Sequence, residues 1–155
     1  MSNESTATGT VRFHRVFKSP PERVYRAILE SDAVVKWLPP YGFTCTVIQN
    51  DVREGGGYTM AFTNFGTGNK HVFSGKFVEL KPGERIVKTD IFDDANLAGE
   101  MKTTFTMRAN LVGTELTIVQ EGIPAAIPAD GCYLGWQESL AQLAKLVDPA
   151  IPDGA

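Results

Sequence analysis

The spacing of apolar and polar side chains divides the chain into one strand, two short helices, a long run of strands and a final helix. From Gly131 to Val147, apolar residues recur every three or four positions, as on one face of a helix. The residues of this stripe are Tyr133, Trp136, Leu140, Leu143 and Val147. A helix of this length spans roughly 25 Å. It is therefore long enough to lie across the concave face of a curved antiparallel sheet.

The N-terminal part of the chain combines a predicted strand with two predicted helices. Residues 10–18 are rich in β-branched and aromatic side chains, which favours a strand. Ser19 is a good N-cap, Pro20 suits the first helical position, and Glu22 would complete a capping box. A helix is therefore expected to begin here, and a second, short helix is expected over residues 33–38.

Residues 43–121 predict about six strands joined by turns. The clearest alternation of inward-facing side chains, with the period of two that strands have, is Tyr58, Met60 and Phe62. Pro82 and Gly83 occupy the centre of a type II turn pattern. Gly75, inside another strand, is expected to mark a kink or a bulge. Because short turns cannot join parallel strands, the sheet must be antiparallel and the fold class α+β.

One domain is expected over residues 10–148, between a flexible N-terminal tail (1–9) and a C-terminal tail (149–155). The formal net charge of −3 lacks the basic excess that a nucleic-acid-binding surface needs. Runs of Lys or Arg and long apolar stretches are also missing, so no membrane is expected as a partner. Because the N-terminus lacks a secretory signal pattern, and Cys45 and Cys132 are most simply reduced thiols, we expect a cytoplasmic monomer or homodimer.

Motifs along most of the chain resemble those of one known superfamily. They comprise Pro-x-x-x-Val-Tyr-x-Ala ending at Ala27, Lys36-Trp37-Leu38-Pro39, residues 52–58, 73–80, 82–87 and 120–124, and Gly135-Trp136 with the leucines that follow. In this order they resemble the START-like helix-grip superfamily (SRPBCC), in its activator of heat-shock protein 90 ATPase homologue-like branch, over roughly residues 11–147.

This resemblance implies a helix-grip (START/Bet v-like) fold. In that fold a curved antiparallel sheet of about seven strands surrounds a long C-terminal helix, two short helices follow the first strand, and an apolar cavity lies inside. The superfamily includes ligand carriers, polyketide cyclases or aromatases and co-chaperone domains. The resemblance therefore indicates where a site lies rather than which chemistry it performs.

No catalytic motif stands out in the sequence, so the catalytic residues are unknown. His14 and His71 are the only histidines, and a Gly-x-Ser-x-Gly elbow is missing. His71 is interpreted as a structural or exposed residue, with a general base as the alternative. Cysteines and histidines lack the spacing of metal ligands, and the glycine-rich segments lead into strands rather than helices. We therefore expect neither a metal nor a cofactor.

Apolar ligand binding is the remaining hypothesis for the interior. The apolar side chains predicted to bind the ligand are Trp37, Phe43, Tyr58, Met60, Phe62, Phe73, Phe105, Tyr133 and Trp136. Lys88 and Asp90 stand where family members often carry apolar residues. If both point inward, the pocket is partly polar and they are ligand-binding candidates, together with Gln120 and Glu121. If both point outward, they belong to a solvated edge.

Three functions follow from these patterns. The first is binding of a small hydrophobic or amphipathic molecule between sheet and helix. The second is an enzyme of the cyclase/aromatase or hydrolase type, in which a desolvated Lys88 with a lowered pKa acts as a base. The third is a chaperone-interacting or regulatory module, which rests on the resemblance alone.

Overall fold

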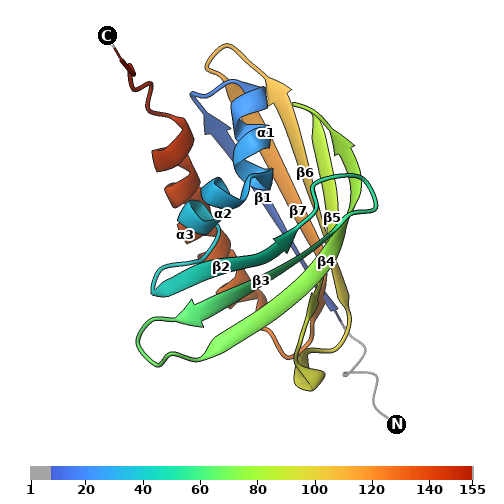
Figure 1. Ribbon diagram of the computed structural model, residues 1–155. Helices are drawn as coiled ribbons and strands as arrows, with labels where there is room; N and C mark the ends of the chain where they lie inside the picture. The colour runs from blue at the N-terminus through green and yellow to red at the C-terminus, as the bar shows by residue number, and fades with distance from the viewer. Residues whose placement is uncertain (1–7, 155) are drawn as a thin grey trace.

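The computed structural model describes residues 8–154 and contains one seven-stranded antiparallel sheet that curves around helix α3 (Figure 1). The elements are β1 (Thr8–Phe17), α1 (Pro21–Leu29), α2 (Ser31–Trp37), β2 (Phe43–Asn50), β3 (Gly57–Asn64), β4 (Lys70–Lys81), β5 (Arg85–Phe92), the 3₁₀ turn η2 (Ala95–Leu97), β6 (Glu100–Ala109), β7 (Thr114–Pro124) and α3 (Ala129–Val147). The strand order in the sheet is β1-β7-β6-β5-β4-β3-β2. The predicted α+β helix-grip fold is therefore confirmed.

The chain ends differ slightly from the expected domain limits. Strand β1 already includes Thr8 and Gly9, which were assigned to the N-terminal tail, and residues 1–7 of that tail lie outside the described residues. Helix α3 ends at Val147, and Asp148 is its C-cap. Within residues 8–154, no helix is both long and apolar enough to cross a membrane.

The start of helix α1 corrects the predicted capping box. Pro20 is the N-cap, Pro21 is the first helical residue, and no side chain caps the helix. Ser19 is buried instead, and its carbonyl oxygen accepts a hydrogen bond of 2.6 Å from the hydroxyl of Thr114. Because proline has no N–H group, Pro21 removes one of the amides that a cap would satisfy.

Two glycines of the sheet have different roles. Gly83 has a φ of +73°, and the Glu84 amide donates to the Lys81 carbonyl at 2.9 Å, which confirms the predicted turn. Gly75 was expected to mark a kink or a bulge; the register shift between β4 and β5 lies further along, between Phe77 and Glu79. A Cβ at Gly75 would lie 1.7 Å from the backbone oxygen of Thr89, so glycine is needed here for a close approach of two strands.

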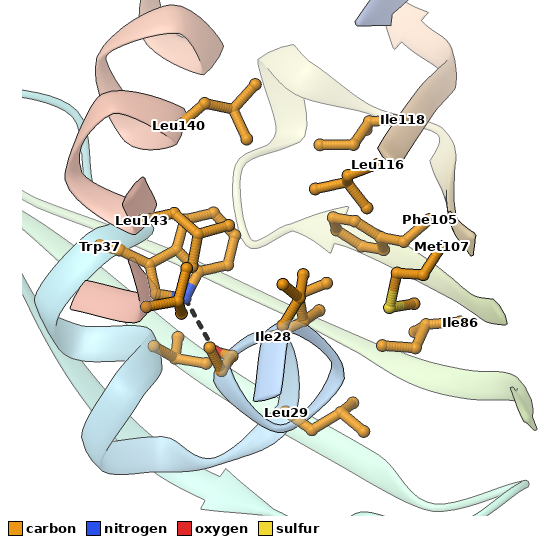
Figure 2. Packing of buried hydrophobic residues seen from close by; sticks show 14 of the residues in the cluster. Ile28, Leu29, Trp37, Ile86, Phe105, Met107, Leu116, Ile118, Leu140 and Leu143 are labelled. Atoms are coloured by element: carbon orange, nitrogen blue, oxygen red, sulfur yellow. Dashed lines mark hydrogen bonds between the residues drawn. The ribbon is translucent and has the colours of Figure 1, made fainter. Parts of the chain in front are cut away.

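The hydrophobic core lies against the C-terminal half of α3. Figure 2 shows Leu143 of α3 close to Trp37, and Leu140 further along the same helix, with Phe105 and Ile118 of the sheet opposite. Trp37 is 1% exposed, and its indole N–H donates 2.8 Å to the carbonyl of Ala27, the dashed line in Figure 2. Large side chains fill this end of the interior. The N-terminal half of α3 lies over the other end.

Polar contacts attach helix α2 to helix α3. The side-chain amide of Gln142 donates to the carbonyls of Trp37 at 3.0 Å and Pro39 at 2.7 Å. The hydroxyl of Ser139 donates 2.6 Å to the carbonyl of Leu38. These bonds satisfy carbonyl groups at the C-terminal end of α2, which otherwise lack partners. They also fix the end of α2 beside the middle of α3.

Candidate functional site

A partly open pocket of about 280 Å³ lies between the sheet and the N-terminal half of α3. On the helix side, its lining residues follow the spacing of one helix face and are Cys132, Gly135, Trp136 and Ser139. Three of these four side chains are small. On the sheet and in the adjoining loops, the lining is mainly apolar and includes Leu38, Phe62, Phe73, Phe92, Met101 and Ile127. Because these helix residues are small, this end of the interior stays open. At the other end, large core side chains fill the corresponding space.

Four polar side chains lie together on the sheet side of this pocket. The strand register pairs Lys88 of β5 with Thr103 of β6, and Thr103 with Gln120 of β7. Directly opposite residues of antiparallel strands point to the same face, with Cβ atoms about 5 Å apart. Asp90 follows Lys88 by two residues and therefore points to that face as well. All four line the pocket, and we refer to them as the polar row.

Lys88 is a buried cation without a carboxylate partner. It is 7% exposed, and within residues 8–154 it forms no ion pair closer than 4.0 Å. Its ammonium lies 4.9 Å from the centroid of the Tyr58 ring, a distance at which the ring face attracts a cation. Burial lowers the pKa of Lys88 to about 8, and the nearby Cys45 thiol partly opposes this. At neutral pH the group is therefore mainly charged, with a minor neutral fraction.

Asp90 and Thr103 are buried with unused hydrogen-bonding capacity. Asp90 is 6% exposed, and burial raises the pKa of its carboxyl group to about 7. Among the described residues, neither Oδ1 of Asp90 nor Oγ1 of Thr103 has a hydrogen-bond partner. Most buried polar groups in native proteins are hydrogen-bonded. Two such atoms on one pocket wall therefore indicate a place where a polar group of another molecule can bind.

Gln120 is oriented by the helix above it. Its Oε1 accepts a hydrogen bond of 2.9 Å from the indole N–H of Trp136. This contact fixes the side-chain amide, so that Nε2 faces the sulfur of Met101 at 3.9 Å, a weak acceptor. The carbonyl oxygen of Gln120 is therefore already hydrogen-bonded to Trp136. Its N–H group contacts only a weak acceptor and is the group more available to a ligand.

The structure brings five of the predicted ligand-binding residues to the pocket: Phe62, Phe73, Lys88, Asp90 and Trp136. It also settles the orientation left open by the sequence, because Lys88 and Asp90 both point inward. Of the two further polar candidates, Gln120 lines the pocket and Glu121 is exposed.

The other predicted residues lie outside the lining. Those that belong to the packed core are Trp37, Tyr58, Met60 and Phe105. Tyr133 is 39% exposed, and its ring packs on that of Phe13 in β1, with 5.0 Å between the ring centroids. Phe43 is half-buried and contacts His71 edge-on, with 6.2 Å between ring centroids. These six predicted residues therefore lie behind or beside the pocket, whereas its aromatic surface comes from Phe62, Phe73, Phe92 and Trp136.

The small and neutral lining residues of the pocket were not among the predicted ligand-binding residues. Cys132, Gly135 and Ser139 share a helix face with Trp136, and this spacing of small residues was a usable signal. Thr103 alternates with Met101 and was readable in the same way. Within the described part of the chain, no group of three His, Cys, Asp or Glu side chains is placed to hold a metal ion. Both cysteines are free and half-buried.

Comparisons with known proteins agree with this architecture. The family model described as "Activator of Hsp90 ATPase homolog 1-like protein" matches residues 18–148. Protein CV1439 from Chromobacterium violaceum, which has a crystal structure, is 58% identical to this chain in sequence. The two structures superpose with a TM-score of 0.90 over 91% of this chain and 98% of that chain. A protein from Rhodobacter sphaeroides has a TM-score of 0.79 at 20% identity, over 90% of this chain and 95% of its own.

The AHSA1 protein from Silicibacter pomeroyi has a TM-score of 0.76 at 21% identity, over 89% of this chain and 96% of its own. At such identities the likeness indicates a shared fold alone. None of the curated proteins compared with the chain matches it. The family model nevertheless covers most of the sequence, and the chain belongs to the Activator of Hsp90 ATPase homolog 1-like family.

Proposed function

We propose that this protein binds a small hydrophobic or amphipathic molecule in the pocket between the sheet and α3. The observation that carries the proposal is the pocket itself, with aromatic and aliphatic walls and a few polar groups on one side. This composition is typical of small-molecule sites, and about 280 Å³ lies near the lower end of their usual volumes. The proposed partner is a small ligand; a cytoplasmic location and a monomer or homodimer remain the expectations from the sequence.

Gly135 supports this proposal from the helix side. Glycine inside a helix lowers the stability of the protein by roughly 0.5–1 kcal/mol relative to alanine. A Cβ at Gly135 would nevertheless meet no atom within 4 Å, so the neighbouring residues do not require glycine. Because Gly135 lines the pocket, the missing side chain keeps space available for a ligand.

Two measurements test the proposal. Mass spectrometry of molecules released by denaturing the protein purified from its own source should reveal a co-purifying apolar compound. Titration with decanol, followed by the fluorescence of Trp136 on the pocket wall, should give saturable one-to-one binding. If no compound co-purifies and neither decanol nor decanoate binds, the proposal is wrong.

A matched pair of variants tests whether the ligand binds in this pocket. Gly135→Leu puts a branched side chain into the pocket and should abolish decanol binding. Gly131→Leu makes the same change on the same helix, also where a Cβ meets nothing within 4 Å, but outside the lining. Its decanol affinity should stay that of the wild type. Equal effects of both variants would contradict binding in this pocket.

A second candidate function, acid–base catalysis, is favoured by Lys88 and Asp90. With pKa values of about 8 and about 7, each group can give or take a proton near neutral pH. On a bound ketone, a neutral Lys88 amine would remove a proton beside the carbonyl, and a protonated Asp90 would donate one to its oxygen. Deuterium exchange into acetophenone, followed by NMR, tests this. Exchange no faster than in buffer, or equally fast with Lys88→Met, would exclude the reaction for this probe.

A further inference from the structure

The hydrogen-bonding groups of the polar row allow an inference about the head group of the proposed ligand. This inference rests on the proposed function, since it concerns the same pocket. Of the four side chains in the row, the Lys88 ammonium only donates hydrogen bonds, and the Gln120 amide presents its N–H group. The Thr103 hydroxyl has no protein partner and is able to donate as well as accept. Three of the four side chains can therefore donate a hydrogen bond to a ligand, and the fourth, Asp90, offers Oδ1 as an acceptor when it is ionised.

We propose that the pocket selects an amphipathic molecule with a single oxyanion head, such as a carboxylate, held over Lys88 and Thr103 with its apolar body against the aromatic walls. Lys88 and Thr103 are directly opposite each other in the β5–β6 register, so both reach one head group. The Lys88 ammonium has no carboxylate within 4.0 Å among the described residues, and an anionic head would supply the missing counter-charge.

A cationic head fits this wall less well than an anionic one. An amine would find Oδ1 of Asp90 as an unused acceptor, but it would face the buried Lys88 ammonium in a low-dielectric environment. Like charges at such a site repel strongly. An uncharged hydroxyl avoids the repulsion, yet it leaves the Lys88 charge without a partner. The arrangement consequently ranks the three head groups as oxyanion, hydroxyl, amine.

Asp90 makes this binding depend on pH. Burial already holds its pKa at about 7, and an anion bound beside it disfavours ionisation further. Binding of an oxyanion should therefore go with uptake of a proton by Asp90, whose protonated carboxyl then donates to the head group. The other titratable groups facing Lys88 and Asp90 are Cys45 of β2, Tyr58 of β3, His71 of β4 and Cys132 of α3. Burial raises the pKa of both thiols above the ordinary value, so both are neutral near pH 7.

Three probes with one apolar body test the inference: decanoate, decanol and decylamine, measured by isothermal titration calorimetry. Decanoate should bind the wild type most tightly near pH 6. A charge-assisted hydrogen bond is worth roughly tenfold or more in affinity. Lys88→Met should therefore lower the ratio of decanoate to decanol affinity by about that factor, and Thr103→Val should lower it several-fold.

Lys102→Met serves as the matched control, since Lys102 neighbours Thr103 on β6 but is exposed on the opposite face. It should leave the ratio unchanged. Decanoate affinity should fall as the pH rises from about 6 to about 9, and Asp90→Asn should flatten this fall near pH 7. If His71→Gln flattens it and Asp90→Asn does not, proton uptake by Asp90 is wrong.

The outcomes separate the two proposals. If decanol or decylamine binds the wild type at least as tightly as decanoate, the oxyanion preference is refuted while ligand binding stands. A ratio that Lys88→Met leaves unchanged refutes it as well. If none of the three probes binds, both proposals fall.

Discussion

Replacing Asp90 by Asn should stabilise the protein at alkaline pH and leave it unchanged at acid pH. Asp90 is buried, and its pKa of about 7 in the folded protein compares with an ordinary value of 3.8. The folded state thus disfavours the ionised carboxylate, because this group has lost its water and Oδ1 has gained no hydrogen bond among the described residues. Asparagine keeps the shape of the side chain but cannot ionise.

The magnitude and its sign follow from linkage between proton binding and folding. Below pH 3.8 the carboxyl group is protonated in both states, so ionisation costs nothing. Between pH 3.8 and about 7 the folded state holds a proton that the unfolded state has lost, so wild-type stability falls as the pH rises. Above pH 7 the full penalty, about 4 kcal/mol as an upper limit, is present. For a chain of this size it corresponds to roughly 10 °C in Tm.

Thermal unfolding at a series of pH values, followed by circular dichroism, measures this difference. The Tm of Asp90→Asn minus that of the wild type should be near zero at about pH 4 and should reach a plateau above about pH 8. Asp93→Asn, in the exposed loop after β5, is the matched control and should show no such rise. A Tm difference that is independent of pH, or that decreases as the pH rises, would refute the conclusion that burial raises the pKa of Asp90.

Three further predictions concern stability. Lys88→Met should raise the free energy of unfolding by up to about 3 kcal/mol below pH 8, because folding buries an ammonium whose pKa falls from 10.5 to about 8; denaturant unfolding should show this gain vanishing above pH 10.5. Gly75→Ala should destabilise the protein by more than about 2 kcal/mol, since its Cβ would collide with the Thr89 oxygen, whereas Gly131→Ala in α3 should be neutral or stabilising. Trp37→Ala should cost about 3–5 kcal/mol by opening a cavity in the core and removing a buried hydrogen bond; a loss below about 1 kcal/mol in urea titrations would contradict the packing described.

The fold was predictable because its signals are local. Alternation in residues 43–121, the turn at Pro82 and Gly83, and the helical spacing near the C-terminus are each readable within a short window. The helix start at Pro21 was not, since Ser19 is buried and its backbone oxygen accepts a hydrogen bond from Thr114, which is remote in the sequence. A capping pattern is a local preference that such a tertiary contact overrides.

The candidate site was predictable only in part, and strand β5 shows why. Alternation puts Lys88 and Asp90 on one face with Ile86, and Thr89 and Ile91 on the other with Val87. Each face therefore begins with an apolar residue, so the pattern does not say which face is inside. In the structure Ile86 and Val87 are both buried. Pairing with β4 and β6 decides the orientation, and that information is non-local.

The division of α3 into two halves explains how the protein tolerates the polar row. Its C-terminal half buries Leu140, Leu143 and Val147 in the core, and burying such a side chain contributes roughly 1.5–3 kcal/mol. Its N-terminal half places small residues over Lys88 and Asp90. Lys88 and Asp90 each destabilise the fold when they carry a charge, because burial disfavours the charged form. A fold selected only for stability would have apolar residues at both positions. Of the four buried side-chain atoms that lack a hydrogen-bond partner among the described residues, Oδ1 of Asp90 and Oγ1 of Thr103 lie on the wall of this pocket, where a bound ligand would satisfy both and offset their cost.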